Sequence, residues 1–351
     1  MKTKPEYKMK KMKLSAVLNS FTDAAGRLIK KVSYRNLVFK GGGVRGIAYM
    51  GALEALEEED VLRKIERVAG SSAGAIAATL ASFRLPVSET VAMFNSLDLS
   101  RVPQTDIYSK YLSKLPPLSN ADNIRRLVES FGWYSSAYFH RWLGEMIASQ
   151  CGHNPRATFS DFHLRGYRGL YVVASNLSRK RSDVFSYEST PDVAVADAVR
   201  LSMSIPLFFE AIRFDGREFG KGDFYVDGGL YNNYPIHLFD FPKYAHLNPF
   251  YRNGINWETL GLFLKSNEME CSVDPVMPEN LFDFLNLTVR SFYDVHDLSN
   301  LDKSLVDQRR SVLINDCGVS SLQFDLEPES EIYRQLYESG RKSVINFLAG
   351  K

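Results

Sequence analysis

The segment RVAGSSAGAIAATLASF, residues 67–83, predicts a strand, a sharp turn and a helix in immediate succession. Ser72 stands in the turn, at the centre of the spacing G-x-S-x-G that it forms with Gly70 and Gly74. A serine on such a strained turn needs neighbours without bulky side chains, which this spacing supplies. The following helix would direct the positive end of its dipole at the serine, where it favours developing negative charge. Ser72 is therefore a candidate nucleophile.

Strands and helices alternate along the chain on both sides of this segment. The alternation predicts an α/β protein with a largely parallel sheet. The sequence has no internal repeat and no low-complexity linker, which favours one domain, residues 34–351, behind an N-terminal arm, residues 1–33. We expect strands at residues 36–39, 67–70, 169–177, 183–189, 224–227 and 260–264. We expect helices at residues 47–58, 73–83, 279–298 and 330–348, and one that Thr190 caps, that starts at Pro191 and that ends near Pro206.

The charge of the chain is concentrated at its start. The sequence of 351 residues has a formal net charge of only +2, which argues against a nucleic-acid-binding protein. Residues 1–35 nevertheless contain ten Lys or Arg and two acidic residues. Within this arm, residues 14–32 place apolar side chains at helical spacing between lysines. Such a helix either lies on an anionic membrane or packs its apolar side on the body of the protein.

No run of 18 apolar residues occurs, so the sequence predicts no membrane-spanning helix. The first residues resemble a signal peptide only weakly, because Asn19, Thr22 and Asp23 interrupt the apolar part. The three cysteines, at positions 151, 271 and 317, are too far apart to indicate a disulfide framework or a metal cluster. We therefore expect a cytoplasmic protein with inert thiols, with leaderless secretion as the alternative.

A glycine-rich loop, GGGVRG at residues 41–46, follows the first expected strand. Its glycines fit the G-x-G-x-x-G spacing of a dinucleotide-binding loop. A dinucleotide site also needs an acidic residue at the end of the second strand, where this chain has Gly70, Ser71 and Ser72. A phosphate-binding P-loop would need Gly-Lys-Ser/Thr after the glycines, and this sequence is absent. The loop therefore presents its amides to something other than a nucleotide.

A nucleophilic serine needs a base. None of the six histidines sits in a recognisable motif, although the chain order serine, acid, histidine leaves Asp227 with His246 or His296 formally open. Asp227, in FYVDGGLYNNYP, ends an apolar strand, and the two glycines after it permit an immediate turn. Asp-Gly after a strand is also an ordinary turn signal. We prefer Asp227 as the base because of its place in the fold. The loop, the serine and this aspartate each follow an expected strand, and the sites of α/β proteins lie at the carboxyl ends of parallel strands.

Four segments together resemble the patatin-like phospholipase family: GGGVRG (41–46), GSSAG (70–74), RLSMSIPLFF (200–209) and DGG (227–229). The resemblance covers about residues 36–235 and leaves residues 236–351 as a C-terminal extension without a known motif. It implies a three-layer α/β/α fold and a serine–aspartate dyad. In this chain the dyad would be Ser72, the nucleophile, and Asp227, the general base. The amides of Gly41, Gly42 and Gly43 would form the oxyanion hole, with Arg45 in support.

The resemblance implies an acyl hydrolase of phospholipids or lysophospholipids, acting at membrane surfaces through an acyl-enzyme, without a metal or cofactor. A soluble carboxylesterase or acyltransferase with the same dyad is one alternative, and a catalytically idle lipid-binding protein is another. An unregulated phospholipase would damage its own cell, so we also expect an activating partner or ligand. One departure from the family pattern is Lys40, where many plant-like members have an acid. Arg45 has two further interpretations, contact with a lipid phosphate or pairing with a carboxylate.

Two aromatic-rich stretches are candidates for contact with lipid. Residues 131–143 have a spacing that suits a buried helix. Residues 239–257 contain six aromatic residues and no clear period. A long irregular loop soon after Asp227 predicts a lid or an interfacial rim beside the site.

Overall fold

The computed structural model describes residues 33–103, 121–246, 248–265, 304–328 and 330–350, together with positions 277, 278, 284, 287, 288 and 291. The amphipathic stripe of the N-terminal arm lies outside the described residues, as do Cys271, His296 and most of the helix expected at 279–298. Within the described residues, no helix is both long enough and apolar enough to cross a membrane.

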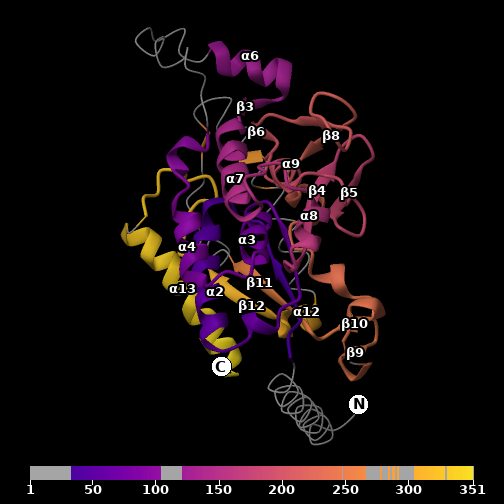
Figure 1. Cartoon of the computed structure of the whole chain (residues 1–351). Coiled ribbons are helices and arrows are strands. Elements are labelled where there is room, and N and C mark those ends of the chain that lie inside the picture. The colour runs from indigo at the N-terminus through magenta and orange to yellow at the C-terminus, as the bar shows by residue number, and fades with distance from the viewer. Residues whose placement is uncertain are drawn as a thin grey trace, which may run out of the picture.

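A central sheet forms the core of the structure (Figure 1). It has eight strands in the order β12-β11-β1-β2-β4-β8-β7, and β5 also pairs with β4. The strands from β12 to β4 run parallel, whereas β5, β7 and β8 pair antiparallel at the other end. The largely parallel sheet predicted from the sequence is confirmed. The strands are β1 (Asn36–Phe39), β2 (Arg67–Ser71), β4 (Gly169–Asn176), β5 (Arg181–Ser186), β7 (Ile212–Phe214), β8 (Asp223–Val226), β11 (Thr259–Lys265) and β12 (Ser311–Asn315).

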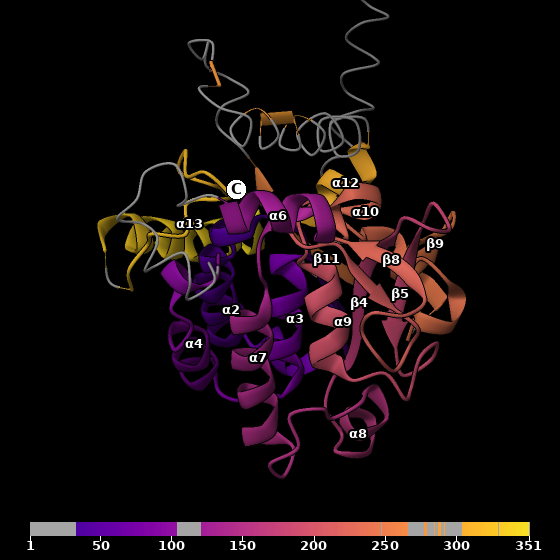
Figure 2. The same ribbon diagram turned by 90° about the horizontal axis from the view of Figure 1, so that it is seen from above.

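Both faces of the sheet are covered, which explains why the strands read as continuous apolar runs. In β1, Leu37 and Phe39 point into the larger hydrophobic core, while Val38 points into a second cluster on the opposite face. Figure 2 shows α3, α7 and α9 together beside the strands. The helices are α2 (Ala48–Glu58), α3 (Ala73–Ser82), α4 (Val87–Asn95), α6 (Ala121–Ser130), α7 (Ala137–Gln150), α8 (Phe159–Leu164), α9 (Val195–Ser202), α10 (Gly229–Asn232), α12 (Leu305–Arg309) and α13 (Glu331–Leu348).

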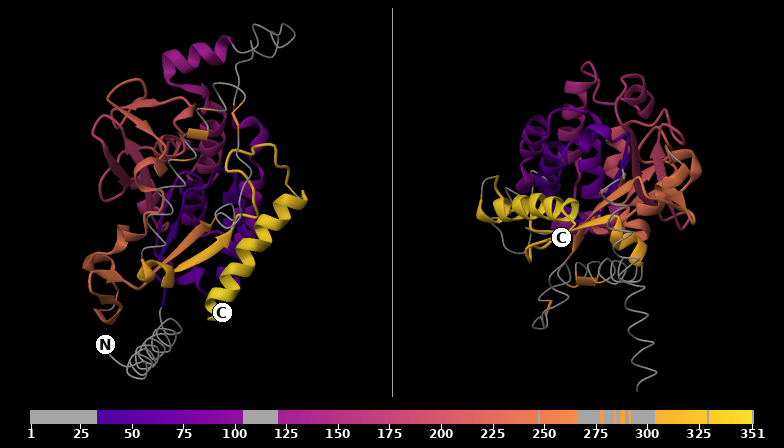
Figure 3. Two further views of the ribbon diagram at one scale, coloured as in Figure 1. Left: turned by 180° about the vertical axis from the view of Figure 1, so that it is seen from behind. Right: turned by 90° about the horizontal axis from the view of Figure 1, so that it is seen from below.

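The C-terminal helix α13 packs along α2 (Figure 3). The contact is close, because a Cβ atom added at Gly51 would lie 2.0 Å from the carbonyl oxygen of Tyr337. Helix α2 follows the glycine-rich loop directly, through the 3-10 turn η1 (Gly43–Ile47). The end of the chain therefore supports the helix that begins at the loop.

The helix expected to start at Pro191 instead starts at Val195 and ends at Ser202, so this prediction is wrong at its N-terminus. Thr190 does not cap a helix. Its hydroxyl accepts a hydrogen bond from the Ser186 amide at 3.1 Å and lies 3.3 Å from the Ser186 carbonyl oxygen. These contacts close the turn after β5, so Thr190 belongs to that turn, and Ala194 just before α9 bridges to Thr158.

The two aromatic stretches also differ from expectation. Residues 131–143 divide into β3 (Gly132–Tyr134), which pairs with β6 (Leu207–Phe209), and the start of α7, where Phe139 and Trp142 are buried as predicted. The second stretch ends in a short hairpin, β9 (Tyr251–Arg252) and β10 (Ile255–Asn256).

This hairpin lies at the amino ends of the parallel strands, because the amides of Arg35 and Asn36 both donate to the carbonyl of Glu258 just before β11. Ser72 follows the carboxyl end of β2. Earlier in the same stretch, Phe239 and Tyr244 are buried in the second cluster. The prediction of a lid or rim beside Ser72 is therefore wrong for this stretch.

Candidate active site

Ser72 occupies the turn between β2 and α3 with a φ of 54° and a ψ of −127°. A positive φ is strained for a residue with a side chain, and it turns the serine away from the regular path of the strand. The positions of Gly70 and Gly74 have no room for a side chain. A Cβ atom at Gly70 would lie 2.1 Å from the Gly74 carbonyl oxygen, and one at Gly74 would lie 2.4 Å from the Phe39 carbonyl oxygen. The steric reason for the G-x-S-x-G spacing is thus present in the structure.

Hydrogen bonds hold the backbone of Ser72 on both sides. Its amide donates to the Ser202 hydroxyl at 2.9 Å, and its carbonyl accepts from the Ala75 amide at 2.8 Å to begin α3. The side chain is 6% exposed. The N-terminus of α3 therefore starts directly at Ser72, as an oxyanion-stabilising helix dipole requires.

Asp227 follows the last residue of β8 and is 1% exposed. The expectation that this strand is parallel is wrong, because β8 runs antiparallel to β4. Its Oδ1 accepts from the Gly229 amide at 2.7 Å, and its own amide donates to the Ser204 carbonyl at 2.7 Å. The turn after it lies against the strand that carries the serine. A Cβ atom at Gly228 would be 2.4 Å from the hydroxyl oxygen of Ser71. The structure thus brings the Asp227 turn and the Ser72 turn together from strands that are 155 residues apart in numbering.

The glycine-rich loop lies beside Ser72, since a Cβ atom at Gly41 would be 3.2 Å from the Ser72 Cβ. The Gly41 amide, however, donates to the Asn233 carbonyl at 2.9 Å. Gly41 is therefore corrected from an expected oxyanion donor to a residue that anchors the loop. The amides of Gly42 and Gly43 have no acceptor among the described residues, so they are the two candidate donors.

Arg45 holds the loop by its backbone and by a carboxylate from the C-terminal extension. Its Nε donates to the Gly42 carbonyl at 3.1 Å, and its Nη1 forms a 2.9 Å ion pair with buried Asp316. Next to it, the Val44 amide donates to the Ser321 carbonyl at 3.1 Å. The carboxylate-pairing interpretation of Arg45 is the one that the structure shows. Residues 316–321 belong to the extension for which the sequence offered no motif.

Four of the residues around the site were missed by reasoning from the sequence. Ser202 and Ser204 lie in the segment 200–209, which resembled the family without indicating a role for either serine. Asn233 follows the DGG motif closely, whereas Asp316 has no local signal at all. Lys40, the departure from the family pattern, is buried with its ammonium 4.8 Å from the centre of the Phe263 ring.

The histidine alternative fails for His246, whose amide donates to Glu258 at the amino edge of the sheet, opposite to Ser72. His237 is also at that edge, where it pairs with Asp240 and Asp307. Among the residues that the structure describes, no group of three or more His, Cys, Asp or Glu side chains is arranged to hold a metal ion.

A serine on a strained strand-to-helix turn, a buried aspartate and a glycine-rich loop, all at the carboxyl edge of an α/β sheet, are typical of serine hydrolases. A family model described as patatin-like phospholipase matches residues 37–240. The chain belongs to the patatin-like phospholipase family, which places it among the lipid ester hydrolases.

Its relatives include viral proteins. An uncharacterized protein of Acanthamoeba polyphaga mimivirus is 28% identical over 326 residues, covering 90% of this chain and 95% of the relative. A probable lipid hydrolase of Invertebrate iridescent virus 6 is 28% identical over 211 residues, 60% of this chain and 64% of the relative. Among solved structures, VipD from Legionella pneumophila has a TM-score of 0.54 at 17% identity, covering 91% of this chain and 67% of that one. At this identity, the similarity to VipD shows a shared fold and nothing further.

Proposed function

We propose that the protein hydrolyses fatty-acyl esters of phospholipids or lysophospholipids, with Ser72 as the nucleophile and Asp227 as the general base. The observation that carries this proposal is the strained Ser72 turn, with a φ of 54°, packed between the Asp227 turn and the glycine-rich loop. A buried residue other than glycine in that conformation costs about 1–3 kcal/mol and is typical of functional sites. The named lipid hydrolase among the relatives supports the same chemistry.

The reaction proceeds in two steps. The Ser72 Oγ attacks the ester carbonyl while Asp227 accepts the proton of the Ser72 hydroxyl. The tetrahedral oxyanion forms beside the Gly42 and Gly43 amides. Collapse of this intermediate releases the alcohol, which takes the proton from Asp227, and leaves the fatty acid esterified to Ser72. A water molecule then gives a proton to Asp227 and attacks the acyl-enzyme. Collapse of this second tetrahedral intermediate releases the fatty acid, and the Ser72 oxygen takes the proton back from Asp227. An oxyanion donor of this kind contributes about 3–4 kcal/mol to such reactions.

The family supports phospholipids or lysophospholipids as the substrate class, and the physical state of these lipids indicates where the enzyme acts. Phospholipids are aggregated in water, so the enzyme must work at a membrane or micelle surface. The basic N-terminal arm, residues 1–33, contains nine Lys or Arg and two acidic residues, a charge that favours its approach to anionic lipid. A soluble esterase would cleave a monomeric short-chain ester equally well, whereas the proposed enzyme gains activity sharply on mixed micelles.

The test is labelling with a fluorophosphonate, which reacts covalently with an activated serine. We expect the wild-type protein to be labelled, and Ser72→Ala and Asp227→Asn to remain unlabelled. Ser71→Ala is the matched control, because Ser71 is the adjacent buried serine and its hydroxyl has no hydrogen-bond partner among the described residues. Labelling that persists in Ser72→Ala would exclude Ser72 as the nucleophile. Vesicle binding by an unlabelled wild-type protein would instead indicate the idle lipid-binding alternative.

A further inference from the structure

The C-terminal end of α9 contacts the backbone of Ser72 and of Gly228, the residue directly after Asp227. Ser202, the last residue of α9, accepts a hydrogen bond from the Ser72 amide through its hydroxyl. The carbonyl of Ser202 accepts from the Gly228 amide at 3.0 Å, directly after Asp227. The carbonyls at the end of a helix lack partners within the helix, so they are available for such contacts. One helix end therefore fixes the positions of two turns that come from different strands.

The hydroxyl of Ser202 both accepts and donates a hydrogen bond in this position. Besides accepting from the Ser72 amide at 2.9 Å, it donates to the Val173 carbonyl of β4 at 2.6 Å. Ser202 is fully buried, with an exposure of 0%, so solvent does not reach the hydroxyl to replace either bond. The side chain thus links the Ser72 turn to the adjacent strand through two hydrogen bonds.

We propose that Ser202 is a positioning residue, whose hydroxyl holds the strained Ser72 turn and so keeps the serine Oγ in the position from which it reacts. The inference rests on the proposed function of Ser72 and Asp227. The strained φ of Ser72 has to be maintained by its surroundings, and its amide is the part of the turn that Ser202 holds. A buried amide without an acceptor is unfavourable, so loss of the hydroxyl drives the turn to relax. A displacement of about 1 Å at a reacting group lowers the rate by about 100-fold.

The experiment compares Ser202→Ala with Ser82→Ala. Ser82 is the last residue of α3, as Ser202 is of α9, and it is also 0% exposed. Its hydroxyl donates to the Thr79 carbonyl, which is a bond within its own helix. For each variant, kcat and KM on a monomeric short-chain ester are measured together with the rate of fluorophosphonate labelling.

We expect Ser202→Ala to lower kcat and the labelling rate about 10- to 100-fold while KM changes less than about 2-fold. Ser82→Ala should leave all three values near those of the wild type. A wild-type labelling rate in Ser202→Ala, a loss confined to KM, or an equal loss in Ser82→Ala would each overturn the inference.

Ser202→Cys is the second variant, for the case that Ser202→Ala does not fold. A thiol is larger than the hydroxyl and is a weak acceptor, so it fills the position without leaving a cavity and weakens the bond to Ser72. We expect the same loss of kcat, and a wild-type rate would overturn the inference. Failure of the proposed function has a different signature. In that case the wild-type protein is not labelled, or Ser72→Ala is labelled.

Discussion

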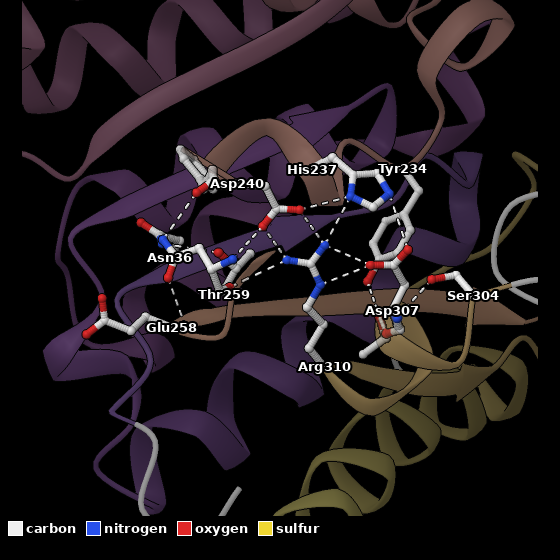
Figure 4. A network of polar contacts seen from close by, with 12 residues as sticks. Asn36, Tyr234, His237, Asp240, Glu258, Thr259, Ser304, Asp307 and Arg310 are labelled. Atoms are coloured by element: carbon white, nitrogen blue, oxygen red, sulfur yellow. Dashed lines mark hydrogen bonds and ion pairs between the residues drawn. The ribbon is translucent and has the colours of Figure 1, made fainter. Parts of the chain in front are cut away.

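The two edges of the central sheet hold their polar groups in different ways. At the carboxyl edge, the turns of Ser72 and Asp227 are held through their backbones, by oxygens of Ser202 and Ser204. At the amino edge, charged side chains hold one another (Figure 4). There the guanidinium of Arg310, 1% exposed, donates to both carboxylate oxygens of Asp240, at 2.6 and 2.7 Å.

The amino-edge network also contains Asp307, which accepts from Arg310 at 2.7 Å, and His237, which lies between the two carboxylates. Two acidic and two basic groups thus meet at the start of β12. We infer from this difference that the carboxyl edge serves catalysis and the amino edge serves stability. Changes in the side chains at the carboxyl edge should alter the rate while the fold persists, and changes at the amino edge should alter the stability while the chemistry persists.

The largest expected effect is that of Asp227→Asn. The amide cannot accept the proton of Ser72, so kcat should fall about 10²- to 10⁴-fold. The free energy of unfolding should change by less than about 1 kcal/mol, because the amide oxygen still accepts from Gly229. Ester hydrolysis and urea denaturation of the same preparation measure both values. A large loss of stability would contradict the inference that side chains at the carboxyl edge affect the rate and not the fold.

Arg310→Met should have the opposite profile. It leaves the carboxylates of Asp240 and Asp307 buried without their cation, which costs about 3–5 kcal/mol of stability. The kcat of the folded fraction should remain near the wild-type value, because the residue lies at the other edge of the sheet. A variant of normal stability and low kcat would contradict the inference that the amino edge serves stability.

Asp316→Asn sharpens the comparison, because it removes a charged partner at the carboxyl edge. Arg45 loses its ion pair and holds the Gly42 carbonyl less firmly, so the amides beside the oxyanion shift. We expect kcat to fall about 10-fold, less than loss of a complete oxyanion donor. Asp316→Glu, which retains the charge, is the control and should recover part of the rate.

The pH dependence of stability tests the amino edge. Hydrogen bonding to Asp240 and to Asp307 raises the pKa of His237 from 6.5 to about 9. A raised pKa in the folded state stabilises the fold fully below about pH 6.5, and this contribution is lost as the pH rises through about 9. His237 is 64% exposed in its side chain, so solvent screening limits the contribution to about 1 kcal/mol. Denaturation between pH 6 and pH 10 should show this loss in the wild type, and an equal loss in His237→Gln would contradict it.

The smallest effect is expected for Ser71→Ala. The hydroxyl is buried and has no hydrogen-bond partner among the described residues, so its removal leaves no group unsatisfied. The free energy of unfolding should change by less than about 0.5 kcal/mol, and hydrolysis should be unaffected. A drop in kcat comparable to that of Ser202→Ala would show that Ser71 supports the Asp227 turn it contacts.

The parts of the site that the sequence predicts are those set by local sterics. Ser72 is predicted as a candidate because the turn around it has room only for glycine at positions 70 and 74, and the strand end before Asp227 marks the second turn. The alternation of elements likewise predicts the sheet, since its strands are short apolar runs. These features depend on neighbours within a few residues.

The features that were missed depend on residues far apart in the sequence. Arg45 pairs with Asp316, 271 residues away, and no local pattern selects that carboxylate among the 41 acidic residues of the chain. Thr190 was expected to cap a helix, yet it bonds back to Ser186. The aromatic composition of residues 239–257 indicates a loop but does not say at which edge of the sheet the loop lies.

The dependence of the glycine-rich loop on residues 316–321 has a consequence for the order in which the protein matures. β11 pairs with β1, and β12 brings Asp316 and Ser321 to the loop that follows β1. A growing chain that has produced every motif through DGG still lacks the groups that fix the loop. We therefore expect the proposed activity only after the C-terminal strands have emerged and docked, so that a nascent or truncated chain should not attack lipid.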